Sequence, residues 1–216
     1  MFKYKAPNHT KLADEKLIIA MLNGDSKAFD EVYKRYNERM LYYFYRMLGN
    51  DKDLAQDFLQ DLFYKIIDKP HLFDASRKFS TWIFSIAHNM CKNEYRNRAN
   101  RDVIEIADDV DYFEHDEVTT DPLYQIEDIF NCLSEFDEIH QTAFLLKYRE
   151  GLSIDEISSI LELSVGTIKS RLFYTRKKIQ KKLQQSSHLS SEYVSSSDCL
   201  RPTNKYRETN STDKKI

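Results

Sequence analysis

The chain has 216 residues, of which 31% are charged and 41% hydrophobic, a composition typical of a globular protein with one or two domains. Its apolar runs fall far short of the roughly 20 residues that span a bilayer, and its N-terminus lacks the apolar stretch of a signal peptide. We therefore expect a cytoplasmic protein that is not membrane-embedded. The cysteines Cys91, Cys132 and Cys199 form no Cys-x-x-Cys pair, so neither a disulfide framework nor a metal site is indicated.

The net charge of −3 conceals two segments of opposite sign. Residues 102–128 contain no Lys or Arg and carry the acids Asp102, Glu105, Asp108, Asp109, Asp111, Glu114, Asp116, Glu117, Asp121, Glu127 and Asp128. Residues 163–191 contain no acid and carry the bases Lys169, Arg171, Arg176, Lys177, Lys178, Lys181 and Lys182. Local fields, rather than the net charge, attract a polyanion, so the basic segment is a candidate nucleic-acid surface.

Only four glycines and four prolines occur in the chain, which favours long helices over hairpins and predicts an all-α fold. Composition divides the sequence into two small helical domains, 10–101 and 121–184, joined by an acidic linker, 102–120. The tail, 185–216, is rich in Ser, Thr and Asn, and we expect it to be disordered because it has little apolar surface to bury.

The first domain shows three helical stripes in chain order. One stripe is formed by Phe29, Val32, Tyr33, Tyr36, Met40, Phe44 and Met47. Gly49 is suited to end this helix in a left-handed conformation, and Asp51 to cap the next one, which stops before Pro70. A third helix begins near Phe79 and ends in a basic stretch.

The second domain contains a helix-turn-helix pattern. Ser153 and Glu156 form a capping box for a short helix that ends near Leu161. A tight turn, 162–164, leads to a basic helix from Val165 to about Leu183, the geometry in which the second helix enters the major groove of DNA. Apolar spacing places one side of this helix in the core and leaves a DNA-facing candidate set, Thr167, Lys169, Ser170, Arg171, Phe173 and Tyr174. The alternative is that these charges form an ordinary solvated helix face.

The segment 165–172 (VGTIKSRL), followed by Arg176-Lys177-Lys178, resembles the fourth conserved region of bacterial RNA polymerase sigma factors, which reads the promoter −35 element. The segments 143–146 and 148–152 also fit that region. The resemblance implies DNA contacts by Thr167, Lys169, Ser170, Arg171, Phe173, Tyr174 and Arg176. Two departures are Glu162, where the family often has Gly, and Ser158, where Ala is common.

The first domain resembles the second sigma region. The segment 57–65 (DFLQDLFYK) is similar to the part that docks on the clamp helices of the polymerase, and it implies polymerase contacts by Asp57, Gln60, Asp61, Phe63 and Lys65. The segment 79–89 (FSTWIFSIAHN) is similar to the part that melts the −10 element. It implies, with the residues directly after it, DNA contacts by Trp82, His88, Asn89, Lys92, Asn93 and Arg96.

Each resemblance has a physical counterpart and an alternative. Asp57, Gln60, Asp61 and Lys65 share one helical face, which suits a reversible protein contact or, equally, a solvated surface. Capturing unstacked bases requires aromatic and basic side chains. Trp82 fits that requirement, but its spacing with Ile86 and Met90 also suits the core.

The two resemblances together identify the chain as a sigma factor of the extracytoplasmic-function (ECF) type. They imply core RNA polymerase and promoter DNA as partners, an anti-sigma factor as an inhibitor, and a linker that threads toward the polymerase cleft. A stand-alone helix-turn-helix activator, which binds DNA without polymerase, is the alternative. No Gly-rich phosphate loop, nucleophile elbow or acid–base constellation is present, so we expect no enzymatic activity, catalytic residue, cofactor or small-molecule substrate.

Overall fold

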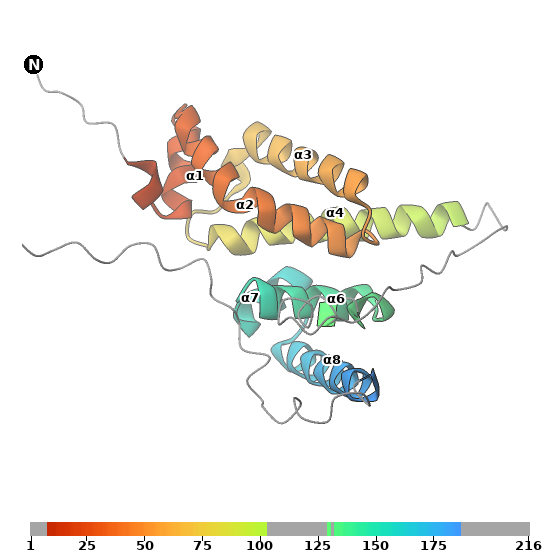
Figure 1. Cartoon of the computed structure of the whole chain (residues 1–216). Helices are drawn as coiled ribbons and strands as arrows, with labels where there is room; N and C mark the ends of the chain where they lie inside the picture. Colours follow the sequence, from red (N-terminus) through yellow and green to blue (C-terminus); the bar gives the residue numbers. More distant parts are fainter. Residues whose placement is uncertain (1–7, 103–128, 131, 187–216) are drawn as a thin grey trace, which may run out of the picture.

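The computed structural model describes residues 8–102, 129–130 and 132–186, and the part of the chain so described contains helices and no strand. The first group of helices comprises α1 (Asp14–Leu22), α2 (Ser26–Met47), α3 (Lys52–Asp68) and α4 (Phe79–Asp102), with short 3-10 turns at His9–Lys11 and Pro70–Leu72. The second group comprises a 3-10 turn (Cys132–Glu135), α6 (Glu138–Phe144), a π-helical turn (Leu145–Arg149), α7 (Ile154–Leu161) and α8 (Val165–Ser186). The two groups lie one above the other (Figure 1).

The predicted linker and tail fall largely outside the described residues. The exceptions are Asp102, which is the last residue of α4, and the C-terminal end of α8, which continues to Ser186, inside the segment predicted as tail. Across the described ranges, no helix combines the length and apolarity needed to cross a bilayer.

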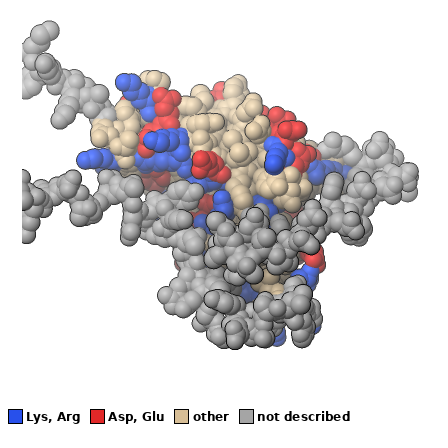
Figure 2. Space-filling model, viewed as in Figure 1, with Lys and Arg blue, Asp and Glu red and all other residues tan. Residues whose placement is uncertain are grey.

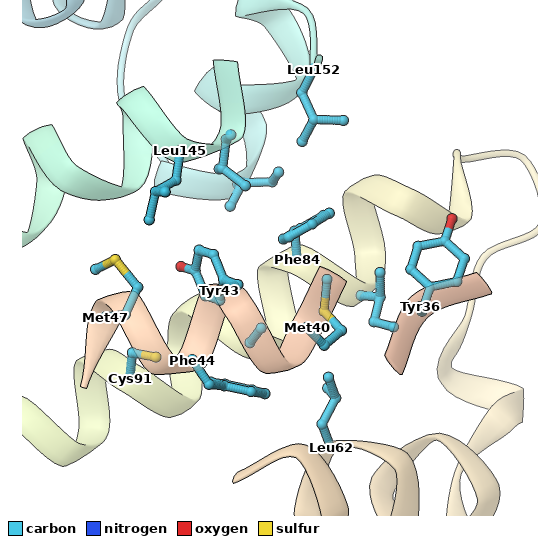
Figure 3. Close-up of a cluster of buried hydrophobic side chains, with 14 of the residues drawn as sticks. Tyr36, Met40, Tyr43, Phe44, Met47, Leu62, Phe84, Cys91, Leu145 and Leu152 are labelled. Carbon is cyan, nitrogen blue, oxygen red and sulfur yellow. The ribbon is translucent and has the colours of Figure 1, made fainter. Parts of the chain in front are cut away.

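Helix α2 is the central element of the first group. Its buried side chains are Ala28, Val32, Tyr36, Met40, Tyr43, Phe44, Arg46 and Met47, and their spacing of three and four residues forms one long stripe. The Asp25 carboxylate accepts a hydrogen bond from the backbone of Lys27 at the start of the helix. Helices α1, α3 and α4 pack around this stripe. Figure 3 shows that Leu62 and Phe84 approach α2 from different sides.

The breaks between helices agree with the expected chemistry. Gly49 follows Leu48, the C-cap of α2, with a positive φ of 79°, and Asn50 comes next at 62°. Asp51 then caps α3 by accepting from the backbone of Leu54. Helix α3 ends at Asp68, before Pro70. Helix α4 starts with a long-range contact, because the backbone N–H of Phe79 donates to the Glu15 carboxylate of α1.

The helix-turn-helix forms as the sequence predicts. Both halves of the capping box are present, since Ser153 accepts from the Glu156 backbone and Glu156 accepts from the Ser153 backbone. Glu162 ends α7 in the left-handed region at φ 55°. The Ser158 hydroxyl donates to the carbonyl of Leu163 and so braces the turn. The two residues that depart from the family pattern, Ser158 and Glu162, therefore both act in this turn.

Glu162 occupies a backbone conformation that costs a side-chain-bearing residue about 1 kcal/mol or more. We expect Glu162→Gly to raise the free energy of unfolding by about 1 kcal/mol, because the relief of strain exceeds the added entropy of the unfolded chain. Urea denaturation followed by circular dichroism measures the change. Glu162→Ala is the matched control and should give no gain; an equal gain from Ala would mean that the glutamate side chain, rather than its backbone, is unfavourable.

Candidate promoter and polymerase interfaces

The predicted DNA-facing residues of α8 divide into an exposed set and an inward set. Ile168, Leu172, Thr175 and Ile179 are buried against the second group of helices. The opposite face exposes Lys169, Ser170, Phe173, Tyr174 and Arg176. Phe173 and Tyr174 are 59% and 63% exposed and pack edge to face, with ring centroids 5.5 Å apart. This face places aromatic rings between Lys and Arg side chains. The rings can make apolar contacts with nucleobases and the cations can attract phosphates, which suits a nucleic-acid partner.

Thr167 lies at the start of this face but belongs to the first turn of the helix. The Ser164 hydroxyl accepts from the Thr167 backbone at 3.1 Å and contacts the Thr167 hydroxyl at 2.8 Å. Ser170 in turn donates to the Thr167 carbonyl. Thr167 is half-buried. Ser164 is therefore the N-cap that the sequence predicts, and it holds Thr167 in place.

Arg171 points away from the exposed face, toward the start of α6. Its Nη1 atom lies 3.6 Å from an Asp137 carboxylate oxygen and 3.2 Å from His140 Nδ1. Asp137 also caps α6 by accepting from the His140 backbone. Burial by itself would raise the pKa of the Asp137 carboxyl, but hydrogen bonds with the backbone and side chain of His140, together with the nearby Arg171 guanidinium, lower it overall. In this conformation Arg171 orients α8 on α6.

The predicted −10 residues of α4 differ in exposure. Asn89, Lys92, Asn93 and Arg96 are exposed, and Arg96 donates to the Asn93 side chain at 3.2 Å. Trp82 is half-buried, and its ring lies 5.3 Å from Phe73 and 5.7 Å from Phe79, centroid to centroid. The structure thus gives Trp82 the core contacts that the sequence left as an alternative.

His88 is the one predicted −10 residue that is buried, with 5% of its surface exposed. Burial, assisted by the nearby positive charge of Lys92, lowers the pKa of His88 to about 4, while Glu162 acts in the opposite direction. Glu162 belongs to the turn between α7 and α8, so His88 faces the second group of helices. The imidazole is consequently neutral at physiological pH.

The predicted polymerase-docking residues lie on α3. Asp57, Gln60, Asp61 and Lys65 are exposed, so the polar face predicted from their spacing is present. Phe63 is 4% exposed and packs against Tyr33 and Phe29, with centroid distances of 4.7 and 6.0 Å. Phe63 therefore supports the helix from within. On the face seen in Figure 2, Lys and Arg side chains lie beside Asp and Glu side chains over the first group.

Sequence patterns do not reveal two features that depend on distant partners. Helix α1 has no predicted counterpart, and Arg35 fixes the segment before it by donating to the carbonyls of His9, Thr10 and Leu12 and to Asp14. The second feature is the contact between the two groups of helices, in which Arg39 pairs with Glu150 at 2.7 Å. The partners are too far apart in sequence for any local pattern to reveal them.

Two family profiles match the chain: Sigma-70 region 2 over residues 32–101, and Sigma-70, region 4 over residues 126–179. The RNA polymerase sigma-H factor of Pseudomonas aeruginosa is 31% identical, with 81% of this chain and 96% of that protein covered. The ECF RNA polymerase sigma-E factor of Haemophilus influenzae is 29% identical, with 81% and 97% covered. The ECF sigma factor SigW of Bacillus subtilis is 28% identical, with 79% and 96% covered.

Two solved structures share the fold. One is CnrH in complex with the cytosolic domain of CnrY, with a TM-score of 0.60, 23% identity, and coverage of 81% of this chain and 99% of that chain. The other is the sigma factor RpoE in complex with the anti-sigma factor NepR from Bartonella quintana, with a TM-score of 0.59, 21% identity, and coverage of 73% and 98%.

The two matched regions, in this order and joined in one chain, define a class of transcription initiation factors. The chain belongs to the RNA polymerase sigma factors of the sigma-70 family, in the ECF group. These comparisons support a sigma factor over the stand-alone activator that the helix-turn-helix alone left open.

The buried imidazole of His88 makes stability depend on pH. Its pKa is about 4 in the folded chain and about 6.5 when exposed, so the unfolded state binds the proton more readily. Stability from this group is complete above pH 6.5 and is lost as the pH falls toward 4. Over that window we expect the free energy of unfolding to fall by roughly 3 kcal/mol.

Denaturation midpoints measured at several pH values, with His88→Gln for comparison, test this expectation. The variant retains a polar side chain but cannot titrate, so its loss of stability between pH 6.5 and 4 should be smaller than that of the parent chain. Because both chains share the same carboxylates, parallel curves would contradict the assignment.

Proposed function

We propose that this sigma factor binds core RNA polymerase through the exposed face of α3, recognises the −10 element through α4 and recognises the −35 element through α8. The observation that carries the proposal is the single-signed face of α8, where Lys169, Arg176, Phe173 and Tyr174 are exposed directly after a helix-turn-helix turn. The polar α3 face adds the surface that a stand-alone activator would not need.

At the −35 element, charged and uncharged side chains of α8 have different proposed contacts. Lys169 and Arg176 contact phosphates and set the position of the helix, while Ser170, Phe173 and Tyr174 face base edges. Thr167 and Arg171 act mainly by holding α8, because both already have partners within the domain. This assignment refines the contact set implied by the family resemblance.

At the −10 element, the exposed side chains Asn89, Lys92, Asn93 and Arg96 are suited to a separated strand. The amides of Asn89 and Asn93 lie four residues apart on one helix face and can hydrogen-bond an exposed base edge, while the cations follow the backbone. Trp82 is half-buried and His88 is buried, so full access of DNA to either side chain requires a change of conformation.

We further propose that an anti-sigma factor restrains this chain in the cytoplasm. The support is that one of the solved structures with this fold holds a sigma factor bound to the anti-sigma factor NepR. The fold is shared, although the identity to that protein is only 21%.

The docking proposal predicts that Asp57→Ala combined with Gln60→Ala weakens association with core RNA polymerase at least about tenfold, because polar interface contacts of this kind contribute about 1 kcal/mol or more each. Co-elution of the purified chain with core polymerase measures it. Asp30→Ala combined with Lys34→Ala changes two exposed residues of α2 and should leave co-elution unchanged. If the parent chain bound core polymerase tightly and both double variants bound it equally well, the polar face of α3 would not be the docking surface.

The −35 proposal predicts a weaker salt dependence for holoenzyme that carries Lys169→Ala and Arg176→Ala. Each phosphate contact that is lost should reduce the slope of log affinity against log salt by about 0.9. The measurement is promoter-duplex binding at several salt concentrations, on a promoter mapped with the parent holoenzyme. Gln180→Ala, an exposed neutral residue of α8, is the control. An unchanged slope in the double variant would exclude both cations from phosphate contact.

A further inference from the structure

Helix α4 begins at a residue that cannot cap it. The carbonyl of Lys78 accepts a hydrogen bond from the backbone of Trp82, so Lys78 occupies the N-cap position of this helix. A lysine side chain has donors and no acceptor, and this one contacts Glu156 at 2.9 Å. The Glu15 carboxylate of α1 supplies an acceptor instead, because it takes a hydrogen bond from the Phe79 backbone at 3.0 Å. A residue 64 positions earlier in the chain therefore caps α4.

Contacts of the preceding residue fix this cap in place. Asp14 accepts a hydrogen bond from Arg35 Nη1 at 2.7 Å and another from the Tyr36 hydroxyl, and both donors belong to α2. The first turn of α1 is thus anchored to α2. Figure 1 shows α1 beside the end of the first group at which α4 begins. A carboxylate on an anchored turn loses little freedom when it accepts from a neighbouring helix, so Glu15 is a preorganised cap.

The turn that Glu15 caps carries Trp82. Phe79 is fully buried, and its ring lies 5.1 Å from Tyr36 and 5.6 Å from Phe73, centroid to centroid. The Trp82 ring packs on Phe73 and Phe79 but is only half-buried, so part of it is open to a ligand. The buried rings hold the side chain of Phe79, whereas the carboxylate holds its backbone N–H. Loss of the cap should therefore loosen the first turn and leave the packing beneath it intact.

Order in the first turn of α4 matters for strand separation. An unstacked base gains free energy by stacking on an aromatic ring, and this gain is reduced by the freedom that the ring loses on binding. A ring on a capped turn has already lost much of that freedom. A ring on a frayed turn must be ordered when the base arrives, so the same contact is weaker.

We propose that Glu15 is a positioning residue for promoter melting: by capping α4 from α1, it holds Trp82 where the ring can stack on a separated base of the −10 element. The proposal rests on the proposed function of α4. It gives α1 a part in promoter opening, although none of the residues assigned to DNA or polymerase lies on α1.

Tryptophan fluorescence of the full chain tests the cap, because Trp82 is the one tryptophan in the sequence. Glu15→Ala should raise the acrylamide quenching constant of Trp82, since a frayed turn exposes the ring more often. Adding Lys78→Ser to this variant should return the quenching constant to the parent value. The new hydroxyl can accept from the backbone of Ser80 or Thr81 and so cap the same turn locally. Unchanged quenching in Glu15→Ala would overturn the proposal.

Promoter opening separates positioning from general stability. The measurement uses holoenzyme on a duplex that is mapped with the parent holoenzyme and carries 2-aminopurine in the −10 element. Glu15→Ala should shift the equilibrium between open and closed complex about fivefold toward closed, as expected for the loss of one N-cap. Affinity for core polymerase, and for the duplex kept closed at low temperature, should not change. Equal opening by the variant and the parent, or an equal loss of all three properties, would contradict positioning.

Matched variants identify the capping contact. Lys78→Ala added to Glu15→Ala removes the same contact with Glu156 as Lys78→Ser does, but it supplies no acceptor and should restore neither quenching nor opening. Glu15→Gln keeps an oxygen acceptor and should remain close to the parent. Glu38→Ala removes one negative charge from an exposed position of α2 and should change neither measurement. Equal restoration by Ala and Ser at position 78, or a Gln variant as impaired as the Ala variant, would contradict the capping role.

The two measurements also distinguish this inference from the proposed function. If the parent holoenzyme did not open the promoter, the proposed function of α4 would fail and the role of Glu15 in melting would fail with it. Quenching of Trp82 in the free chain would still show whether Glu15 caps α4. If the parent opened the promoter and Glu15→Ala opened it equally well, only the role of Glu15 would fail. Circular dichroism checks that each variant keeps its helices.

Discussion

The buried stripe of α2 is the constraint on which the rest of the structure depends. The buried side chains of this helix contact α1, α3 and α4, and the helix also contacts α6 in the second group. Tyr36 illustrates the point, since its ring packs edge to face on Phe79 while its hydroxyl donates to Asp14. A helix that is apolar over so many turns must find partners on several sides. The polar faces proposed for polymerase and DNA are therefore carried by the helices that surround α2.

Features that depend on neighbouring residues were predictable. The capping box of α7, the cap of α3 by Asp51 and the left-handed turn at Gly49 all depend on residues within a few positions of one another. The all-α fold and the order of the long helices are readable from apolar spacing. The sequence also predicts which side of α8 is buried, because its apolar residues recur at helical spacing and its charged residues lie between them.

The features that could not be predicted depend on contacts between distant segments. Spacing alone left Arg171 beside Lys169 and Ser170, yet Asp137 and His140 turn it inward. Phe63 lies within the docking segment, but Tyr33 and Phe29 of α2 enclose it. His88 is buried by the second group. In each case, residues outside the side chain's own helix determine its orientation or burial, so the neighbouring sequence does not predict it.

The π-helical turn at Leu145–Arg149 determines which residues of the second group of helices face the first group. A π turn accommodates one residue more than an α turn, and this one is closed by the hydrogen bond from the Glu150 backbone to the Leu145 carbonyl. Deleting a single residue here would restore α-helical winding and rotate the residues after the turn by about 100°. Arg149 and Glu150 would then leave Tyr42 and Arg39. The length of this short segment is thus more strongly constrained than its composition, and substitutions within it should be tolerated far better than insertions or deletions.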